Sequence, residues 1–352
     1  MKFATGASGG APESHETSDH TPSDWRPGLL FFCKRSASFL DPDDHQKRTA
    51  TWTYTRIQSP GLPALYMKCS LCIDGVPATD GFSMGWNIAY TLKVSLAEAW
   101  ERYWMMRIAK SDAGGRGSLT SSNGFAAGMN ATEAIRSARE EVAERKILVE
   151  AWQSQSGWTE VRVKGLLSHM VIGFLAHHGW RVRVFYVCKA GIGAIVTGLA
   201  EHPDFGCAFD STFLHWPTIN CKTHAVITPE KELRVVKSIL KSTAFRAKVR
   251  PDSTFELPVS GSPEDHARFY SMPSNAAAFA FLDRRSPTAG ELPVDRDQAR
   301  LANVSIDEFI CELLFPGAHL PAVARAYHPE WDPLIWGKKS IAGENQWPHP
   351  LA

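Results

Sequence analysis

The 352-residue sequence lacks any apolar run close to the roughly 20 residues that a membrane-spanning helix needs. It also lacks an excess of charge of one sign, because 38 Lys and Arg residues stand against 37 Asp and Glu residues. The net charge of +1 gives no electrostatic reason to expect a nucleic acid or an anionic membrane as partner. No basic segment followed by an apolar one opens the chain, so we expect a cytoplasmic protein.

A disulfide framework and a structural zinc site are also missing. The seven cysteines are an odd number scattered along a long chain, which favours reduced thiols. Cys69-Ser-Leu-Cys72 is the single Cys-x-x-Cys pair, and no second pair at a suitable spacing supplies the remaining zinc ligands. In a strand the two side chains would point to opposite faces, so we interpret the pair as ordinary strand sequence.

What remains is the composition of a soluble globular protein, with 44% apolar and 21% charged residues. Residues 1–24 contain little that is apolar and predict a disordered tail. Residues 25–352 are expected to form one domain that ends in a Pro-rich tail at 345–352. Strands and helices interleave without regular βαβ spacing, which predicts an α+β fold of mixed or antiparallel sheets packed by helices.

Hydrophobic periodicity and turn residues place the expected elements. Strands are predicted at 29–32, 49–57, 65–73, 158–163, 180–187, 192–199 and 309–315, and helices at 87–109, 132–148, 166–178, 228–245, 262–270 and 276–282. The segments 75–85 and 111–122 read as a turn-rich link and a mobile connector. In the helix at 132–148 we predict Thr132 as the N-cap and a buried stripe of Ala134, Ile135, Ala138, Val142 and Ile147.

Two of these helical segments carry the phrase Glu-x-x-Glu-Arg. It occurs as Glu98-Ala-Trp-Glu101-Arg102, and again as Glu141-Val-Ala-Glu144-Arg145 after the turn Ser122-Asn-Gly-Phe-Ala-Ala-Gly128. Carboxylates at i and i+3 project from one face of a helix, so the two helices offer four carboxylates that could converge. A single copy would most simply be a solvated helix face, and recurrence on two largely apolar helices weakens that reading.

Converging carboxylates suit magnesium, which takes oxygen ligands and commonly shares them with the phosphates of a nucleotide. The four glutamates could hold two ions, while Arg102 and Arg145 balance the phosphate charge. Neither a Walker loop nor a kinase Gly-rich loop occurs, so a nucleotide site here would be of another design.

The two motifs resemble the signature of YcaO-type proteins, in which two Glu-x-x-Glu-Arg helices build an unusual magnesium–ATP site. Asp265-His-Ala-Arg-Phe-Tyr270 with Ala276–Leu282 looks like a further helix region of that family, and Phe315-Pro-Gly317 like its strand that ends in Pro-Gly. The terminus Asn345-Gln-Trp-Pro-His-Pro-Leu-Ala352 is similar to the Pro-rich tail of azoline-forming members. The resemblance runs, in patches, from about Gly75 to the last residue.

The resemblance implies three sets of site residues. The metal ligands would be Glu98, Glu101, Glu133, Glu141 and Glu144, and the nucleotide-binding residues Ser95, Arg102, Asn123, Ser137 and Arg145. The catalytic tail would comprise Pro348, His349, Pro350 and the carboxylate of Ala352. An unperturbed histidine titrates near neutrality, so the ring of His349 is a candidate for proton transfer.

The same resemblance implies a YcaO-like ATP-binding fold with ATP and Mg²⁺ as cofactors, and an enzyme that activates a backbone amide of a ribosomally made precursor peptide. Attack by a Cys, Ser or Thr side chain would give the azoline precursors of thiazoles and oxazoles. The expected partners are the precursor, a leader-binding subunit and a flavin-dependent dehydrogenase, with a homo-oligomer inside the complex.

Two alternatives stay open. The first keeps the enzyme class but forms a thioamide or an amidine. The second is a non-catalytic scaffold of the same fold, suggested by departures from the family pattern at Val94, Met129 and Lys241.

Overall fold

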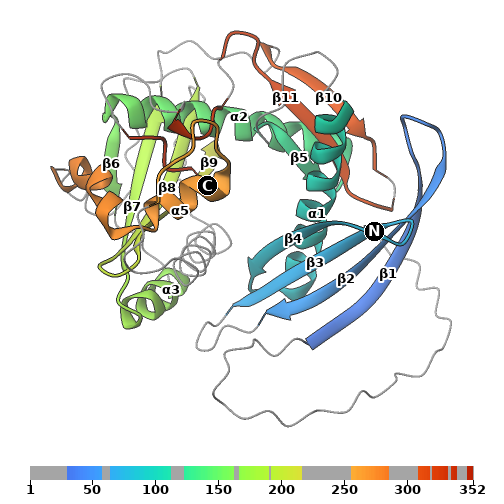
Figure 1. Ribbon diagram of the computed structural model, residues 1–352, viewed down its shortest axis with the longest axis horizontal. Helices are drawn as coiled ribbons and strands as arrows, with labels where there is room; N and C mark the ends of the chain where they lie inside the picture. Colours follow the sequence, from blue (N-terminus) through green and yellow to red (C-terminus); the bar gives the residue numbers. More distant parts are fainter. Residues whose placement is uncertain are drawn as a thin grey trace.

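The computed structural model describes residues 30–57, 64–111, 123–161, 166–189, 192–215, 255–284, 308–317, 319–331, 334–338 and 347–351. The predictions for residues 1–24, for the helix at 228–245 and for Lys241 lie outside them. No helix in these ranges is both long and apolar enough to cross a membrane. The described residues form three antiparallel sheets and their helices (Figure 1), which confirms the α+β class.

The first sheet is a meander of β1 (Leu30–Leu40), β2 (Lys47–Ile57), β3 (Leu65–Ile73) and β4 (Val76–Gly85), covered by α1 (Ile88–Ser111). Its buried face packs against Trp100 and Trp104 of α1. Helix and sheet approach closely at Gly81, where a Cβ atom would overlap the backbone of Ser95 and Ala99. The sequence therefore seats α1, which carries the first acidic motif, directly on β4.

Strand β4 corrects the prediction of a turn-rich link at 75–85. Only Asp74 and Gly75 form the turn, both with positive φ, and Ile73 pairs with Val76 across it. A two-residue Asp-Gly turn between strands is a strong hairpin signal, because both central positions need positive φ.

The second sheet has the order β10 (Ile310–Phe315), β11 (Ala322–Tyr327), β5 (Phe125–Gly128). Helix α2 (Ala131–Ser154) packs its first half on the small residues of this sheet. The expected buried stripe is present, although Ile135 is only partly buried. The predicted N-cap was wrong by two positions, because Asn130 has extended dihedrals and its side chain accepts a hydrogen bond from the N–H of Glu133.

The third sheet has the order β6 (Trp158–Val161), β7 (Arg181–Lys189), β8 (Gly193–His202), β9 (Gly206–His215). Three helical segments pack with this sheet: α3 (Leu166–His177), α5 (Pro263–Tyr270) and η2 (Pro273–Arg284). Segment η2 is a 3₁₀ helix, which corrects the prediction of a helix at 276–282. The second half of α2 reaches this sheet, as Figure 1 shows, and buries Ile147 and Trp152 in its core. One helix therefore joins two sheets.

The described cysteines Cys69, Cys72, Cys188, Cys207 and Cys311 are free thiols. On β3 the Cys69 side chain is buried and that of Cys72 is partly exposed, so the pair faces opposite sides as predicted. Burial raises the pKa of the Cys69 and Cys207 thiols to about 12. These two are core side chains rather than reactive thiolates.

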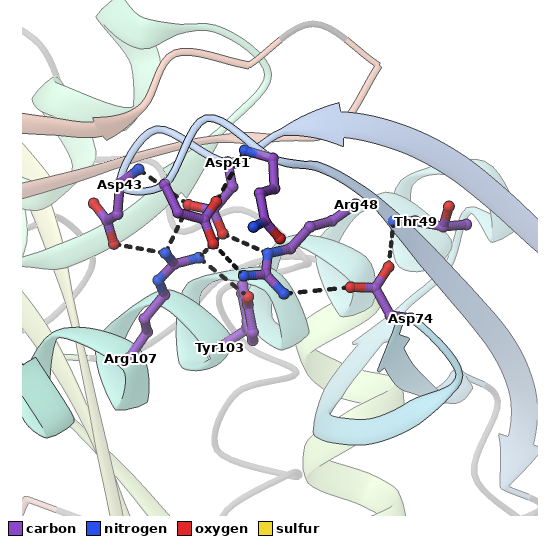
Figure 2. A network of polar contacts seen from close by, with 9 residues as sticks. Asp41, Asp43, Arg48, Thr49, Asp74, Tyr103 and Arg107 are labelled. Carbon is purple, nitrogen blue, oxygen red and sulfur yellow. Dashed lines mark hydrogen bonds and ion pairs between the residues drawn. The ribbon is translucent and has the colours of Figure 1, made fainter.

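An ion network around the buried Asp41 ties the β1–β2 hairpin to the last turns of α1 (Figure 2). The fully buried Asp41 carboxylate accepts a 2.7 Å hydrogen bond from Arg48 Nε and bonds to both terminal nitrogens of Arg107. Burial alone would raise the pKa of Asp41. Hydrogen bonds from Arg107, the Asp43 backbone and Arg48, with the charge of Arg107, outweigh that effect and hold the pKa below its ordinary value. The network, which sequence analysis missed, anchors the end of α1.

Candidate functional site

The acidic motif of α1 is held by the backbone of β4. Glu98 Oε2 accepts a 2.8 Å hydrogen bond from the N–H of Phe82, and its Oε1 accepts one of 2.7 Å from Arg102. Arg102 in turn donates to the carbonyl of Asp80 at 3.3 Å. The first glutamate and the arginine of this motif thus have fixed positions on the sheet.

Glu101 lies between the two helices. Its Oε2 accepts a 3.1 Å hydrogen bond from the N–H of Ala127 on β5. Burial raises the pKa of Glu101 well above its ordinary value, and the charges of Glu141 and Glu98 add to the effect. Glu101 of α1 and Glu141 of α2 are therefore close enough to repel one another, and the convergence of all four carboxylates on a metal stays a prediction.

On α2 the second motif is joined to the third sheet. The buried Glu144 Oε1 accepts hydrogen bonds from Ser211 Oγ of β9 at 2.7 Å and from Arg145 Nη1 at 3.3 Å. The other terminal nitrogen of Arg145 lies 3.9 Å from Glu141 Oε1. Arg145 therefore contacts both glutamates of its own motif.

These carboxylates suit magnesium in chemistry, although they do not form a finished ligand set. Across the described ranges, no three Asp, Glu, His or Cys side chains are grouped so that they could hold a metal ion as they stand. Glu98, Glu101 and Glu144 are instead satisfied by protein donors. All the candidate ligands are carboxylate oxygens, and a cation would offset the burial and the repulsion that raise the pKa of Glu101. The residues present fit a magnesium ion that displaces some of these hydrogen bonds.

Glu133 lies on the same face of α2, two turns before Glu141. Its carboxylate accepts a 3.0 Å hydrogen bond from the N–H of Met129 and so stabilises the helix start. This capping role accounts for an acid at the position without a metal, and a ligand role for Glu133 stays a prediction.

The predicted nucleotide-binding polar residues are not all equally accessible. Ser95 is fully buried and donates to the carbonyl of Leu92 at 3.0 Å, so it stabilises α1 internally. Ser137 is half-buried on the face of α2 that carries Glu133 and Glu141. Of these two serines, Ser137 is the more accessible, and a nucleotide contact for it stays a prediction.

Asn123 is half-buried in the turn before β5, while Ser122 lies outside the described residues. Gly124 has φ of 78°, and its carbonyl accepts a 2.8 Å hydrogen bond from Ala326 of β11. A Cβ at this glycine would overlap the Ala326 carbonyl, so the tight turn requires Gly. The turn therefore fixes Asn123 at the edge of the second sheet.

The Pro-rich tail is packed into the protein. Pro348, His349, Pro350 and Leu351 are buried, which argues against a frayed terminus, while Ala352 lies outside the described residues. Figure 1 shows this end of the chain beside α5. Leu351 belongs to the core that also contains Trp152.

The ring of His349 does not titrate near neutrality, so that expectation was wrong. Its Nε2–H donates to the carbonyl of Ile335 at 2.8 Å. Burial, followed by the electrostatic interactions with His266 and Arg145, lowers the pKa of His349 to about 3. The influence of Arg145 also shows that the tail lies near the second acidic motif.

Sequence reasoning missed four residues around this site. Ser211 was missed because β9 was not recognised as a strand, and Trp152 because its helix was predicted to end earlier. His266 and Tyr270 lie in the Asp265–Tyr270 segment, which was recognised as similar to a family region without a role being assigned. Both bond to the tail. The histidine and tyrosine one helical turn apart are the signal that could have found the contact.

A family model described as YcaO cyclodehydratase, ATP- and Mg²⁺-binding, matches residues 85–324, which is more than half of the chain. No curated protein matches the sequence. Among solved structures, the chain is similar to the E. coli microcin synthetase McbBCD complex at 9% identity, covering 80% of this chain and 88% of that chain, with a TM-score of 0.50. This likeness concerns the fold.

Two further structures are similar at lower TM-scores. YcaO from Methanopyrus kandleri bound with AMPPCP and Mg²⁺ shares 13% identity, covering 86% of this chain and 85% of that chain, with a TM-score of 0.44. The E. coli McbBCD complex with pro-MccB17 bound shares 10% identity, covering 84% of this chain and 87% of that chain, with a TM-score of 0.47.

Proposed function

Since the chain belongs to the YcaO family, we propose that it is an ATP-dependent peptide cyclodehydratase that converts Cys, Ser or Thr residues of a ribosomally made precursor into azolines. The observation that carries the proposal is the meeting of two Glu-x-x-Glu-Arg helices, with a buried Pro-rich tail near the second arginine. The tail favours the azoline-forming branch through its resemblance to members of that branch.

The proposed reaction balances as follows. The side-chain sulfur or oxygen of the precursor adds to the carbonyl carbon of the preceding amide, and the carbonyl oxygen takes the γ-phosphoryl group of ATP. Phosphate then leaves with that oxygen, and a C=N bond forms. The protons of the nucleophile and of the amide N–H are lost, so the products are azoline, ADP, phosphate and one net proton.

In this proposal the residues of the chain chiefly position groups and neutralise charge. Glu98, Glu101, Glu141 and Glu144 would hold magnesium, which supplies charge stabilisation to the transferring phosphoryl group. Arg102 and Arg145 can turn from their glutamate partners to phosphate oxygens, because each contacts a carboxylate that the metal would take. Ser137 and Asn123 would contact the nucleotide, and Glu133 remains a candidate outer ligand.

The tail supplies the group that accepts a proton. The neutral His349 ring is a poor base, because burial holds its pKa near 3 and its N–H is bound to Ile335. We assign the role to the carboxylate of Ala352. Pro348 and Pro350 restrict the backbone of the tail and so reduce the entropy lost when it is placed.

The proposal includes partners. We propose that a separate subunit binds the leader of the precursor, that a flavin-dependent dehydrogenase oxidises azolines to azoles, and that the chain forms a homo-oligomer within the complex. The isolated chain should then process precursor poorly, and addition of the leader-binding subunit should restore activity.

The mass of the product tests the proposal. A candidate precursor peptide that contains Cys, Ser and Thr residues is incubated with the chain, the leader-binding subunit, MgATP and no sulfide donor, and the mass of the peptide is then measured by mass spectrometry. Loss of one water for each modified residue, with ATP consumed, is the expected result. Exchange of oxygen for sulfur on adding sulfide, without water loss, would instead identify a thioamide synthetase, and no ATP consumption would identify a scaffold.

A further inference from the structure

Three successive backbone carbonyls of the tail are bound by three side chains. The indole N–H of Trp152 on α2 donates to the carbonyl of Trp347 at 3.2 Å. The hydroxyl of Tyr270 on α5 donates to Pro348, and Nδ1 of His266 on the same helix donates to His349 at 2.8 Å. A row of consecutive carbonyls, each with its own side-chain donor, is a binding arrangement rather than incidental packing.

The chemistry of the tail explains why side chains perform this task. Proline has no backbone N–H, so an extended segment containing Pro348 and Pro350 cannot form a regular strand ladder. Buried carbonyls left without donors would still be costly. Side-chain donors satisfy them and fix the position of the segment along its own axis, because each donor meets one particular carbonyl.

His266 has a defined tautomer in this arrangement. Its Nε2 accepts a 2.8 Å hydrogen bond from the N–H of Gly337, so the ring proton must be on Nδ1, which donates to His349. Burial lowers the pKa of His266 to about 4, so the ring is neutral at pH 7 and can accept at one nitrogen and donate at the other. A single ring therefore joins the tail, α5 and the 334–338 segment.

Apolar contacts support these hydrogen bonds. The Trp336 ring lies against both histidines, with centroids 5.0 Å from His266 and 4.9 Å from His349. Beyond the third carbonyl, Leu351 is 2% exposed and belongs to the core around Trp152. The tail is held at both its polar and its apolar groups.

We propose that Trp152, Tyr270 and His266 form a carbonyl clamp, a set of positioning residues that fixes the C-terminal segment in one register beside the acidic motif of α2. The clamp itself is independent of the reaction. Its consequence for catalysis rests on the proposed function, because a tail that slides by one residue would misplace its terminus.

Two substitutions at one position separate the two hydrogen bonds of His266. His266→Asn places an amide N–H where Nδ1 is and keeps the donor to the tail. His266→Gln places an amide oxygen where Nε2 is and keeps only the acceptor for Gly337. Tyr270→Phe removes the central donor alone, and Tyr54→Phe, which removes a buried hydroxyl on β2, serves as the matched control.

The readout is release of the last residues by carboxypeptidase Y from the full-length chain, followed by intact mass. Trimming tracks the fraction of time that the tail is open. Loss of one buried hydrogen bond should raise the rate of Leu351 release about tenfold in His266→Gln and Tyr270→Phe, and much less in His266→Asn and Tyr54→Phe. Unchanged trimming in the first two, or equal acceleration in all four, would overturn the clamp.

A second readout separates the clamp from the proposed function. With the precursor and its leader-binding subunit, His266→Gln should lower kcat for dehydration about tenfold, while the KM for MgATP stays within about twofold of the parent value. His266→Asn, which keeps the donor to the tail, should keep kcat close to that of the parent protein. Faster trimming with unchanged kcat would leave the clamp standing and remove the tail from catalysis. A raised KM with unchanged trimming would assign His266 to the nucleotide instead and overturn the clamp.

Discussion

Two regions of this molecule bury acidic side chains beside arginines, with opposite electrostatic results. In the hairpin network both arginines bond directly to the buried carboxylate of Asp41, and the pKa of Asp41 falls. At the candidate site the two arginines contact Glu98 and Glu144, while Glu101 receives a backbone N–H, and the pKa of Glu101 rises. The first arrangement is complete in itself, whereas the second has a surplus of negative charge that a bound cation would balance.

The largest effect is expected on MgATP turnover, from a substitution among the glutamates of the candidate site. Glu144→Gln removes the charge of a proposed magnesium ligand and keeps the shape of the side chain, so MgATP turnover with precursor and partner should fall at least about a hundredfold. The melting temperature should change little, because the Gln carbonyl can still accept from Ser211. Glu150→Gln is the matched control, since Glu150 lies on the same helix and pairs with Lys146 and Lys189. Full turnover in Glu144→Gln would remove this residue from the site.

Removing the charge from the complete network should act on stability instead. In Asp41→Asn both arginines lose their buried anion, and we expect the free energy of unfolding to fall by about 2 kcal/mol, because Arg48 and Arg107 are only partly buried. Urea unfolding measures the change. The KM for MgATP of the folded variant should stay normal, and a large rise in KM would mean that this network is part of the site.

The two buried, neutral histidine rings predict that the stability of the fold depends on pH. His266 and His349 have folded pKa values of about 4 and about 3, below the ordinary 6.5. The unfolded chain therefore binds more protons, and the stability that these rings contribute is complete above pH 6.5 and is lost as pH falls towards 4. The slope is about 1.4 kcal/mol per pH unit for each ring.

Urea unfolding at pH 7 and pH 5 tests this dependence. His266→Asn should flatten the slope relative to the parent protein, because asparagine does not titrate. An identical slope in both proteins would show that protonation of the His266 ring does not cause the loss of stability at low pH.

The smallest expected effect is on the free energy of unfolding. Removal of one carboxylate charge should raise it at the candidate site, whereas the same change lowers it in the hairpin network. Glu101→Gln should raise the free energy of unfolding by about 1 kcal/mol in magnesium-free buffer, because it removes repulsion from Glu98 and Glu141. Denaturant unfolding with EDTA present measures it. A loss of stability comparable to that of Asp41→Asn would show that the glutamates do not repel one another.

The acidic helices could be predicted because their information is local. Glu98, Glu101, Glu141 and Glu144 recur at helical spacing among strong helix formers, and both helices occur where expected. The sequence does not state which protein donors satisfy these carboxylates, since Ser211 lies 67 positions from Glu144 and only folding brings them together. The same holds for the tail, whose donors come from two distant helices.

The missed strands have another cause. Strand β11 is rich in alanine, a weak strand former, and its small side chains let α2 lie close to the sheet. Strand β9 begins with Gly and contains Asp and Ser, which favour turns when read alone. In both, tertiary packing decides the conformation against local preference.

Helix α2 also fixes the distance between the candidate site and the tail. Glu144 and Trp152 lie on one uninterrupted helix, so eight residues set the axial distance between Glu144 and Trp152, the first donor of the carbonyl clamp, at about 12 Å. Inserting or deleting a single residue between them would turn Trp152 by about 100° about the helix axis, away from the Trp347 carbonyl. Point substitutions on the outer face of this stretch can be absorbed, whereas a change in its length would separate the tail from the site.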